Sequence, residues 1–200
     1  MLRTNSLAFR IGAIAAGWSL LGLLVGSYFL SSLFRQSAES GFDNRLLGDL
    51  ESVIAVAELD CAGTVIMPVP LIAERFMNPF SGWYWQIASI DNPQQPRPKQ
   101  MMRSRSLWDQ SLTLTPIEKQ GELRLDYATG PKLQRLRYAQ RVVSLPPAEA
   151  AEGEPACKVG PRVRIAVAGD LSDIEADIAE FDSTLLWSVT IMGAGLIGLM

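Results

Sequence analysis

The chain has 200 residues, which allows about one ordinary domain with room for an appendage. Its formal net charge is −3, and the stretch from Glu39 to Asp182 holds all 21 acidic and 15 of the 18 basic residues, a balance that argues against a nucleic-acid-binding protein. Histidine is absent, which excludes a histidine general base, a histidine-containing triad and a histidine-ligated metal site within this chain. Two cysteines are too few for a disulfide-dense miniprotein.

Residues 11–34 contain no Asp, Glu, Lys or Arg and predict a helix that crosses a membrane. As a helix they would span about 36 Å, compared with about 30 Å for the hydrocarbon core of a bilayer. A cleaved signal peptide is the alternative, because Arg3 and Arg10 supply its basic start. Its apolar region is normally only about 7–15 residues long and ends at a small-residue site. The length of the run therefore favours an uncleaved transmembrane helix after a cytoplasmic segment, residues 1–10.

Residues 183–200 are also free of charged side chains and predict a second, short transmembrane helix. A terminal carboxylate in hydrocarbon would be poorly solvated, so we expect the chain to continue beyond Met200; a true tail that dips into the bilayer is the alternative. Basic residues before the first helix favour a cytoplasmic N-terminus. Two crossings make a multi-pass protein of the cell membrane, in which residues 35–182 form the domain between the helices and residues 36–182 lie outside the cytoplasm.

Cys61 and Cys157 both fall in this external part, where the environment of bacteria and of secretory compartments is oxidising. The two cysteines are therefore candidates for a disulfide. Two separate thiols are the alternative, and the sequence leaves both open because it does not give the distance between them.

A helix is predicted to run on from the first apolar segment into the external domain. Apolar residues recur there at helical spacing with charged residues between them: Phe42, Leu46, Leu50, Ile54 and Ala57. Gly63 would end this helix, since glycine is a common stop signal. A last helix is predicted at Ser172, where Ser172 and Glu175 fit a capping box, and nothing breaks it before the second apolar segment.

Alternation of apolar and polar residues predicts about five strands in the centre of the domain. They are expected over residues 83–87, 103–109, 122–127, 136–145 and 162–167. The order of helix, strands and helix indicates an α+β domain flanked by two transmembrane helices.

Four short strings in this layout are similar to strings of bacterial transmembrane two-component sensor histidine kinases. They are residues 41–46 (GFDNRL), 80–87 (FSGWYWQI), 103–109 (RSRSLWD) and 167–170 (VAGD). The chain therefore resembles the N-terminal sensor and membrane portion of that family. The resemblance implies a PAS-like extracytoplasmic sensor domain, placed in the periplasm by a protein of the inner membrane, and none of the four strings is catalytic.

The resemblance also implies a cytoplasmic part encoded after residue 200. That part would carry a phosphoacceptor histidine, bind ATP and Mg²⁺ and pass its phosphoryl group to a response regulator, and the protein would form a homodimer in membrane lipid. This chain by itself is expected to contain no catalytic residue and no cofactor or metal site.

The residues expected to couple an external signal to the membrane lie where the chain enters and leaves the domain. They are Phe42, Leu46 and Leu50 on the first helix and Ile174, Ile178 and Phe181 on the last. We expect a small shift or rotation of the two helices to carry the signal across the membrane.

Tyr84, Arg103, Arg105 and Trp108 are candidates for a ligand surface, because aromatic side chains give large contact areas and arginines attract anions. The alternative is that the aromatic residues fill the core of a small sheet and that the cations form a solvated strand edge.

The sequence thus predicts the sensory and membrane-spanning part of a histidine kinase. Two other classes stay open: a sensor with another output, such as a cyclase or a chemoreceptor, and a structural protein of the cell envelope. The sequence downstream of Met200 discriminates between them.

Overall fold

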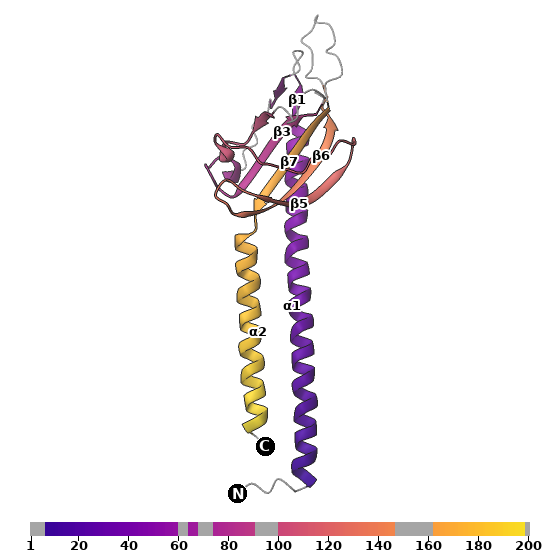
Figure 1. Ribbon diagram of the computed structural model, residues 1–200, viewed down its shortest axis with the longest axis vertical. Helices are drawn as coiled ribbons and strands as arrows, with labels where there is room; N and C mark the ends of the chain where they lie inside the picture. The colour runs from indigo at the N-terminus through magenta and orange to yellow at the C-terminus, as the bar shows by residue number, and fades with distance from the viewer. Residues whose placement is uncertain (1–6, 60–63, 68–73, 91–99, 147–161, 199–200) are drawn as a thin grey trace, which may run out of the picture. The chain divides into compact units, whose positions relative to one another are not determined.

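The computed structural model describes residues 7–59, 64–67, 74–90, 100–146 and 162–198. The chain divides into two compact units. One unit, called here the domain, is Gly41–Ser172; the other, called here the helical pair, is formed by the segments before and after it. The elements in chain order are α1 (Leu7–Val56), β1 (Glu58–Leu59), β2 (Val65–Ile66), η1 (Glu74–Phe76), β3 (Trp83–Ser89), β4 (Gln100–Arg103), η2 (Arg105–Leu107), β5 (Leu123–Thr129), β6 (Arg135–Ser144), β7 (Arg162–Asp170) and α2 (Ser172–Gly198) (Figure 1).

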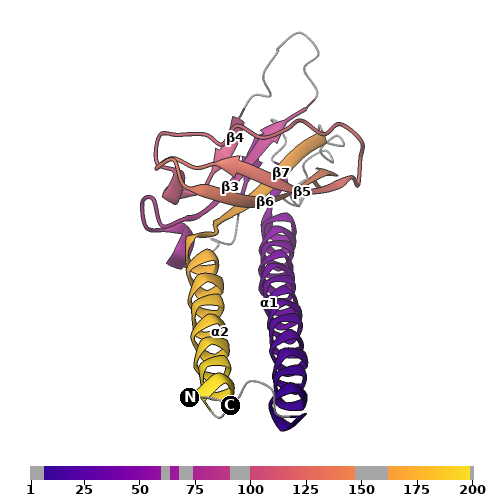
Figure 2. The same cartoon turned by 60° about the horizontal axis from the view of Figure 1, so that its bottom comes forward.

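The domain is built around one antiparallel sheet with the strand order β4-β3-β7-β6-β5. The first and the last strand of the sheet, β3 and β7, therefore lie next to each other in its middle, and β4 and β5 form its edges (Figure 2). β1 and β2 form a separate two-stranded pair. The expected α+β class is confirmed, and four of the five expected strands match β3, β5, β6 and β7.

The strand expected over residues 103–109 is wrong for most of its length. β4 ends at Arg103, and a short 3₁₀ turn, η2, follows. The physical reason is that two buried serines bind β3 through their side chains. Ser104 Oγ accepts a hydrogen bond from the Trp85 N–H (3.1 Å), and Ser106 Oγ donates one to the Trp83 carbonyl (2.6 Å). These bonds replace the regular ladder that a longer β4 would need.

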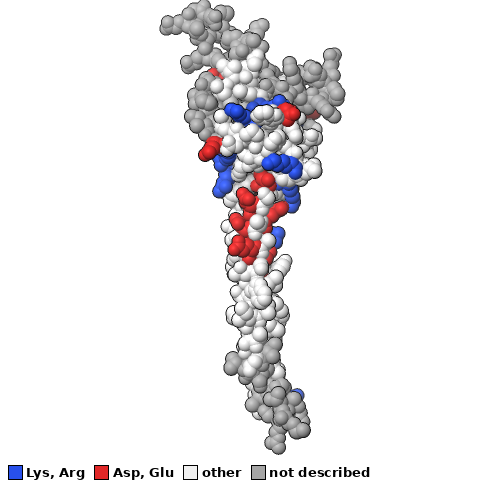
Figure 3. All heavy atoms as spheres, turned by 90° about the vertical axis from the view of Figure 1, so that its left-hand side faces the viewer, with Lys and Arg blue, Asp and Glu red and all other residues white. Residues whose placement is uncertain are grey.

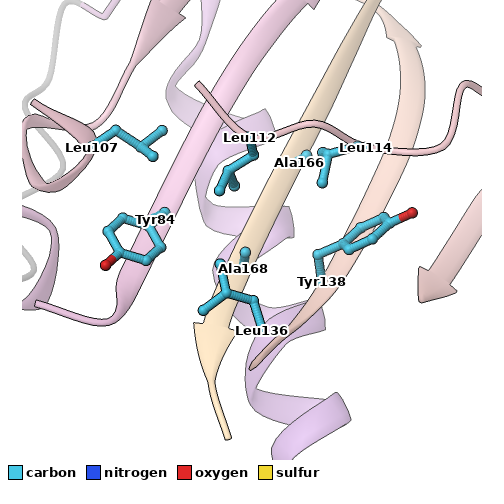
Figure 4. Close-up of a cluster of buried hydrophobic side chains, with 8 residues drawn as sticks. All are labelled: Tyr84, Leu107, Leu112, Leu114, Leu136, Tyr138, Ala166 and Ala168. Carbon is cyan, nitrogen blue, oxygen red and sulfur yellow. The ribbon is translucent and has the colours of Figure 1, made fainter. Parts of the chain in front are cut away.

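One face of the sheet is covered by the coil segment that follows η2. Gln86 of β3 holds this segment against the sheet by two hydrogen bonds. Its Nε2 donates to the Leu112 carbonyl and its Oε1 accepts from the Leu112 N–H, both at 3.0 Å. The buried side chains between the segment and the sheet are Tyr84, Leu107, Leu112, Leu114, Leu136, Tyr138, Ala166 and Ala168 (Figure 4). Burying this apolar cluster is a main source of stability for the domain.

The domain part of α1 lies behind the opposite face of the sheet in Figure 4. Phe42, Leu46 and Leu50 are buried, as the helical spacing predicts. Ala57 is buried as expected, but Ile54 is only partly buried and Val53 is completely buried, so one position of the expected apolar stripe moves from Ile54 to Val53. The difference arises because an α-helix has 3.6 residues per turn. Residues on one face of the helix are therefore spaced alternately by three and four positions, not by four throughout. The helix ends at Val56, earlier than the expected stop at Gly63, which lies outside the described residues.

In the described part of the chain, α1 is the one helix that is long and apolar enough to cross a membrane. This judgement rests on length and composition over Arg10–Val56, where the most apolar window has a mean hydropathy of 1.7 and none of it is buried. The second crossing, over residues 183–200, stays a prediction. α2 runs as one helix from Ser172 to Gly198, as expected for an exit helix without a break.

The start of α2 differs from the expected capping box. Asp170, at the end of β7, accepts a hydrogen bond from the Ser172 N–H through its Oδ1 (2.9 Å). Ser172 itself already lies in the first helical turn. The carboxylate of Asp170 thus satisfies one of the free N–H groups of the helix start, and its negative charge lies at the favourable end of the helix dipole.

Candidate functional site: the seat of α1 on the sheet

A row of paired residues crosses the middle of the sheet near the point where α1 enters the domain. Gly169 on β7 is the centre of the row, with Trp83 of β3 on one side and Arg137 of β6 on the other. Tyr127 of β5 extends the row as the cross-strand partner of Arg137. Directly paired residues project from the same face of an antiparallel sheet, so these side chains form one surface. This surface, with the two ion pairs that join it to α1, is called here the seat.

Phe42 of α1 rests on this surface at Gly169. The ring centroids of Phe42 and Trp83 are 5.3 Å apart with a tilted geometry. A Cβ atom at residue 169 would lie 2.7 Å from Phe42 Cζ, which is closer than real Cβ contacts allow, and 3.0 Å from Trp83 Cζ3, which is a very tight contact. Glycine is therefore the residue that lets both aromatic rings approach the backbone of the central strand.

An ion pair fixes the next residue of α1 to the same row. Arg137 donates two hydrogen bonds to Asp43, from Nε to Oδ1 (2.9 Å) and from an Nη to Oδ2 (2.8 Å). This is the bidentate geometry that makes arginine–carboxylate pairs directional as well as strong. The Arg137 guanidinium also lies 4.6 Å from the centre of the Tyr127 ring. Both partners are largely shielded from solvent, so the pair holds the rotation of α1 about its own axis.

A second ion pair holds α1 on the other side of Trp83. Arg75 of η1 bonds the buried Asp49 of α1, and its guanidinium lies 5.0 Å from the centre of a Trp83 ring and 5.5 Å from that of Phe76. This pair is less complete than the first, because Asp49 Oδ2 and Arg75 Nε are buried without a hydrogen-bond partner. Burial raises the pKa of the Asp49 carboxyl above its ordinary value, although Arg75 and Arg45 act in the opposite direction.

The raised pKa of Asp49 predicts a pH-dependent stability. The folded domain holds the Asp49 proton more tightly than the unfolded chain, where an aspartate has a pKa of about 3.9. The stability from this group is therefore fully present below that value and is lost as the pH rises through the pKa of the folded state. We expect the stability of the wild type relative to Asp49→Asn to increase as the pH is lowered from neutral to about 4, measured by urea unfolding.

The control for this measurement is Gly48→Ala, which changes no titratable group and should shift the free energy of unfolding by the same amount at every pH. A wild-type advantage that shrinks as the pH falls would contradict the assignment.

The close approach at Gly169 predicts a steric effect. Gly169→Ala should lower the free energy of unfolding by about 1–3 kcal/mol, because the added methyl group overpacks the contact of Phe42 and Trp83. Gly48→Ala is again the matched control: nothing lies within 4 Å of its Cβ position. That substitution should be neutral or stabilising by up to about 1 kcal/mol, because alanine is the better helix former. Equal losses from both variants would show that the contact at Gly169 has no special role.

Three of the four strings singled out in the sequence meet at this seat. String 41–46 supplies Phe42, string 80–87 supplies Trp83, and string 167–170 supplies Gly169. The strings also bind each other through the backbone, since the Asp170 N–H donates to the Gly82 carbonyl (2.9 Å). Gly82 has a φ of 89°, a left-handed conformation that glycine adopts without strain. The fourth string, 103–109, is hydrogen-bonded to the backbone of β3 beside the seat through the side chains of Ser104 and Ser106.

The predicted ligand surface does not come together as one site. Tyr84 is completely buried in the core and its hydroxyl accepts a hydrogen bond from Gln134 Nε2 (2.9 Å), as the core alternative predicts. Both faces of β3 are covered, whereas the alternation suggested one covered face. Arg103 is exposed and donates to the carbonyls of Asp109 and Gln110 (3.2 Å each), which gives it a structural role in the turn. Arg105 and Trp108 are exposed.

The predicted coupling residues of the last helix belong to α2, and Phe181 among them contacts α1 within the helical pair. The rings of Phe34 and Phe181 are stacked with centroids 4.1 Å apart. Asp182 accepts hydrogen bonds from Ser31 Oγ (2.5 Å) and from an Arg35 Nη (3.2 Å). Ile178 is buried and Ile174 partly buried. Cys61 and Cys157, the candidates for a disulfide, lie outside the described residues.

Sequence reasoning identified Phe42 of the seat as a coupling residue but missed Gly169 and both ion pairs, Asp43–Arg137 and Asp49–Arg75. A glycine inside an alternating strand is a signal for a close backbone approach and could have identified Gly169. The two arginines carried no signal, because their partners depend on the strand register and on the placement of η1.

The described residues contain no group of three or more Cys, Asp or Glu side chains placed to hold a metal ion. No protein-family model matches the chain, and neither the curated proteins nor the solved structures contain a match. The seat of α1 joins a long apolar helix to a folded domain by aromatic and ionic contacts. Such an arrangement can couple a change in the sheet to a movement of the helix.

Proposed function

We propose that the chain is the sensory and membrane-spanning part of a two-component sensor histidine kinase. The observation that carries this proposal is the continuity of α1, which is one helix from the apolar segment to the core of the domain. A rearrangement of the sheet at Gly169 would move Phe42 and Asp43, and the rigid helix would pass the movement on to the membrane. Helix shifts of this kind are an established form of signal transmission in proteins.

The strand order supports the finer assignment of a PAS-like sensor domain. In PAS-like domains, as here, a five-stranded antiparallel sheet has its first and last strands side by side in the middle. The chain leaves the central strand β7 and enters α2 after one residue, Leu171. The same part of the sheet therefore contacts the incoming helix and starts the outgoing one, as a signalling role requires.

The contacts within the helical pair support a role for both helices in transmission. The stacking of Phe34 on Phe181 and the bonds from Ser31 and Arg35 to Asp182 tie α1 to α2 at the outer ends of the two apolar segments. We propose that α2 forms the second crossing and that residues 36–182 lie in the periplasm. The protein acts as a homodimer, and ATP, Mg²⁺ and the response regulator bind to the part encoded after residue 200.

The proposal predicts where the enzymatic activity resides. The protein made from the complete reading frame, in membranes with [γ-³²P]ATP and Mg²⁺, should become labelled on a histidine, and the label should be acid-labile and pass to a response regulator. The 200-residue chain alone should stay unlabelled, because it has no histidine to accept the phosphoryl group.

Two outcomes would favour the rival classes. A stop codon directly after Met200 in the native gene would reject the kinase and favour a structural envelope protein. A cyclase or chemoreceptor region after Met200 would keep the sensor domain and change its output.

A further inference from the structure

Three bulky apolar residues of the domain have left-handed backbones. Among the described residues, Phe80 (φ 55°), Trp108 (φ 56°) and Leu133 (φ 64°) are the only residues other than glycine with a positive φ. A positive φ is strained for a residue with a Cβ atom, and turns normally place Gly, Asn or Asp there. Bulky apolar residues at all three positions call for an explanation beyond turn geometry.

The three residues belong to loops that contact one another. The Phe80 N–H donates to the Ser106 carbonyl (2.8 Å), which joins the loop before β3 to η2. Lys132 Nζ lies 5.7 Å from the centre of the Phe80 ring, which joins the same loop to the turn between β5 and β6. Residues 77–82, 104–109 and 130–134 therefore form one continuous feature, called here the loop rim.

The loop rim presents large apolar side chains to solvent. Leu133 is 86% exposed, Trp108 57% and Met77 48%. Cations accompany them, because Lys132 is the neighbour of Leu133, and Arg105 lies in the turn that precedes Trp108. Tryptophan and leucine beside lysine and arginine form the combination of side chains that settles at a membrane–water interface.

The strand register places the loop rim at the end of the sheet where the chain enters and leaves the domain. The turn of the rim at residues 130–134 follows the pair Thr129–Arg135, next to Leu136, the partner of Asp170. Trp83, which follows the first loop of the rim, is the partner of Gly169. Phe42 and the start of α2 lie at this same end.

Chain connectivity limits the distance between this end of the domain and the proposed membrane segment of α1. The apolar run of α1 ends at Phe34, and Gly41 begins the domain. The helical turns between them rise only about 10 Å, and the polar layer of a bilayer is itself about 5–8 Å thick. The remaining gap is small enough for a loop at this end of the sheet to bridge.

We propose that the loop rim is a membrane-docking surface, in which Trp108 and Leu133 insert into the interface of the bilayer that α1 crosses. This inference rests on the proposed membrane insertion of α1. The exposed apolar area supplies most of the attraction, and Arg105 and Lys132 add contacts to lipid phosphates. Asp173 and Glu175 lie in the first turn of α2, and acidic side chains gather over this helix on the face drawn in Figure 3, so the proposal does not rely on charge attraction to anionic lipid.

The test is photo-crosslinking of the full chain in nanodiscs made of phosphatidylcholine alone. Benzoylphenylalanine replaces Leu133 in one protein and Trp108 in another, and mass spectrometry measures the lipid adducts. The matched control carries the same amino acid at Ser144, which is exposed at the opposite end of β6 from the rim. A further protein carries it at Trp18, which is 72% exposed in the apolar part of α1 and reports membrane insertion itself.

We expect lipid adducts at 133, 108 and 18, with yields at least several-fold above that at 144. Adducts at 18 without adducts at 133 and 108 would overturn the docking surface and leave the membrane helix in place. No adduct at 18 would overturn the membrane insertion on which both proposals depend. Adducts between two copies of the chain at 133, in place of lipid adducts, would overturn the docking surface in favour of a protein contact.

Discussion

Leu46→Ala is expected to lower the free energy of unfolding of the domain by about 2–5 kcal/mol. Leu46 is completely buried in the part of α1 that lies behind the sheet, so truncation removes apolar contacts and leaves a cavity. The loss can be measured by urea unfolding of the chain in detergent, followed by the fluorescence of Trp83 and Trp85 in β3. A loss of this size would show that α1 is part of the domain core rather than a tether beside it.

Leu47→Ala is the matched control, because the neighbouring leucine is only partly buried on the same helix. It should cost less than half as much as Leu46→Ala. Equal costs would mean that the side of α1 that faces the sheet is assigned wrongly.

Ala179→Pro is expected to uncouple the domain from the output of the complete protein. Ala179 is exposed in the interior of α2, so proline there causes no clash with the core but removes a helical hydrogen bond, at a cost of about 3 kcal/mol or more. The measurement is the rate of autophosphorylation in membranes, compared with and without the substitution Gly169→Ala. The steric change at the seat should alter this rate in an otherwise normal protein and leave it unchanged in the Ala179→Pro background.

The control for uncoupling is Ala179→Ser, which keeps the helix intact at a small cost in helix propensity. It should transmit the change at Gly169 normally. Transmission through the proline variant would rule out a rigid, continuous α2 as the signalling element.

Much of the architecture could be predicted from the sequence because it depends on local periodicity. The spacing of Phe42, Leu46 and Leu50 predicts a buried helix face, and the alternation in β3, β5, β6 and β7 predicts those strands. The strand over residues 103–109 was mispredicted because Ser104 and Ser106 bond their side chains to the backbone of a distant strand. A local sequence pattern cannot predict a bond between residues that are so far apart in the chain.

The candidate site was predictable only in part, for a related reason. Phe42 belongs to a visible apolar stripe, but its contact with Gly169 depends on which strands are neighbours. The pair of Asp43 and Arg137 likewise requires the register of β6 and the rotation of α1. Tyr84 is buried because the coil segment after η2 covers the second face of the sheet, and coil has no periodicity that could indicate this cover.

The central position of β3 and β7 has a consequence for the order of assembly during synthesis. β3 leaves the ribosome early. Its neighbour along its whole length is β7, which is the last strand of the domain to be synthesised. Pairings between residues so far apart in the chain form slowly, because a large loop must close first. Phe42 therefore cannot pack against Gly169 until that residue has left the ribosome, directly before α2. In the proposed topology, the first helix enters the membrane while its domain is still incomplete, and folding of the sheet coincides with the arrival of the second helix at the membrane. Substitutions that delay the pairing of β7 should then expose a half-built sheet to proteolysis and aggregation.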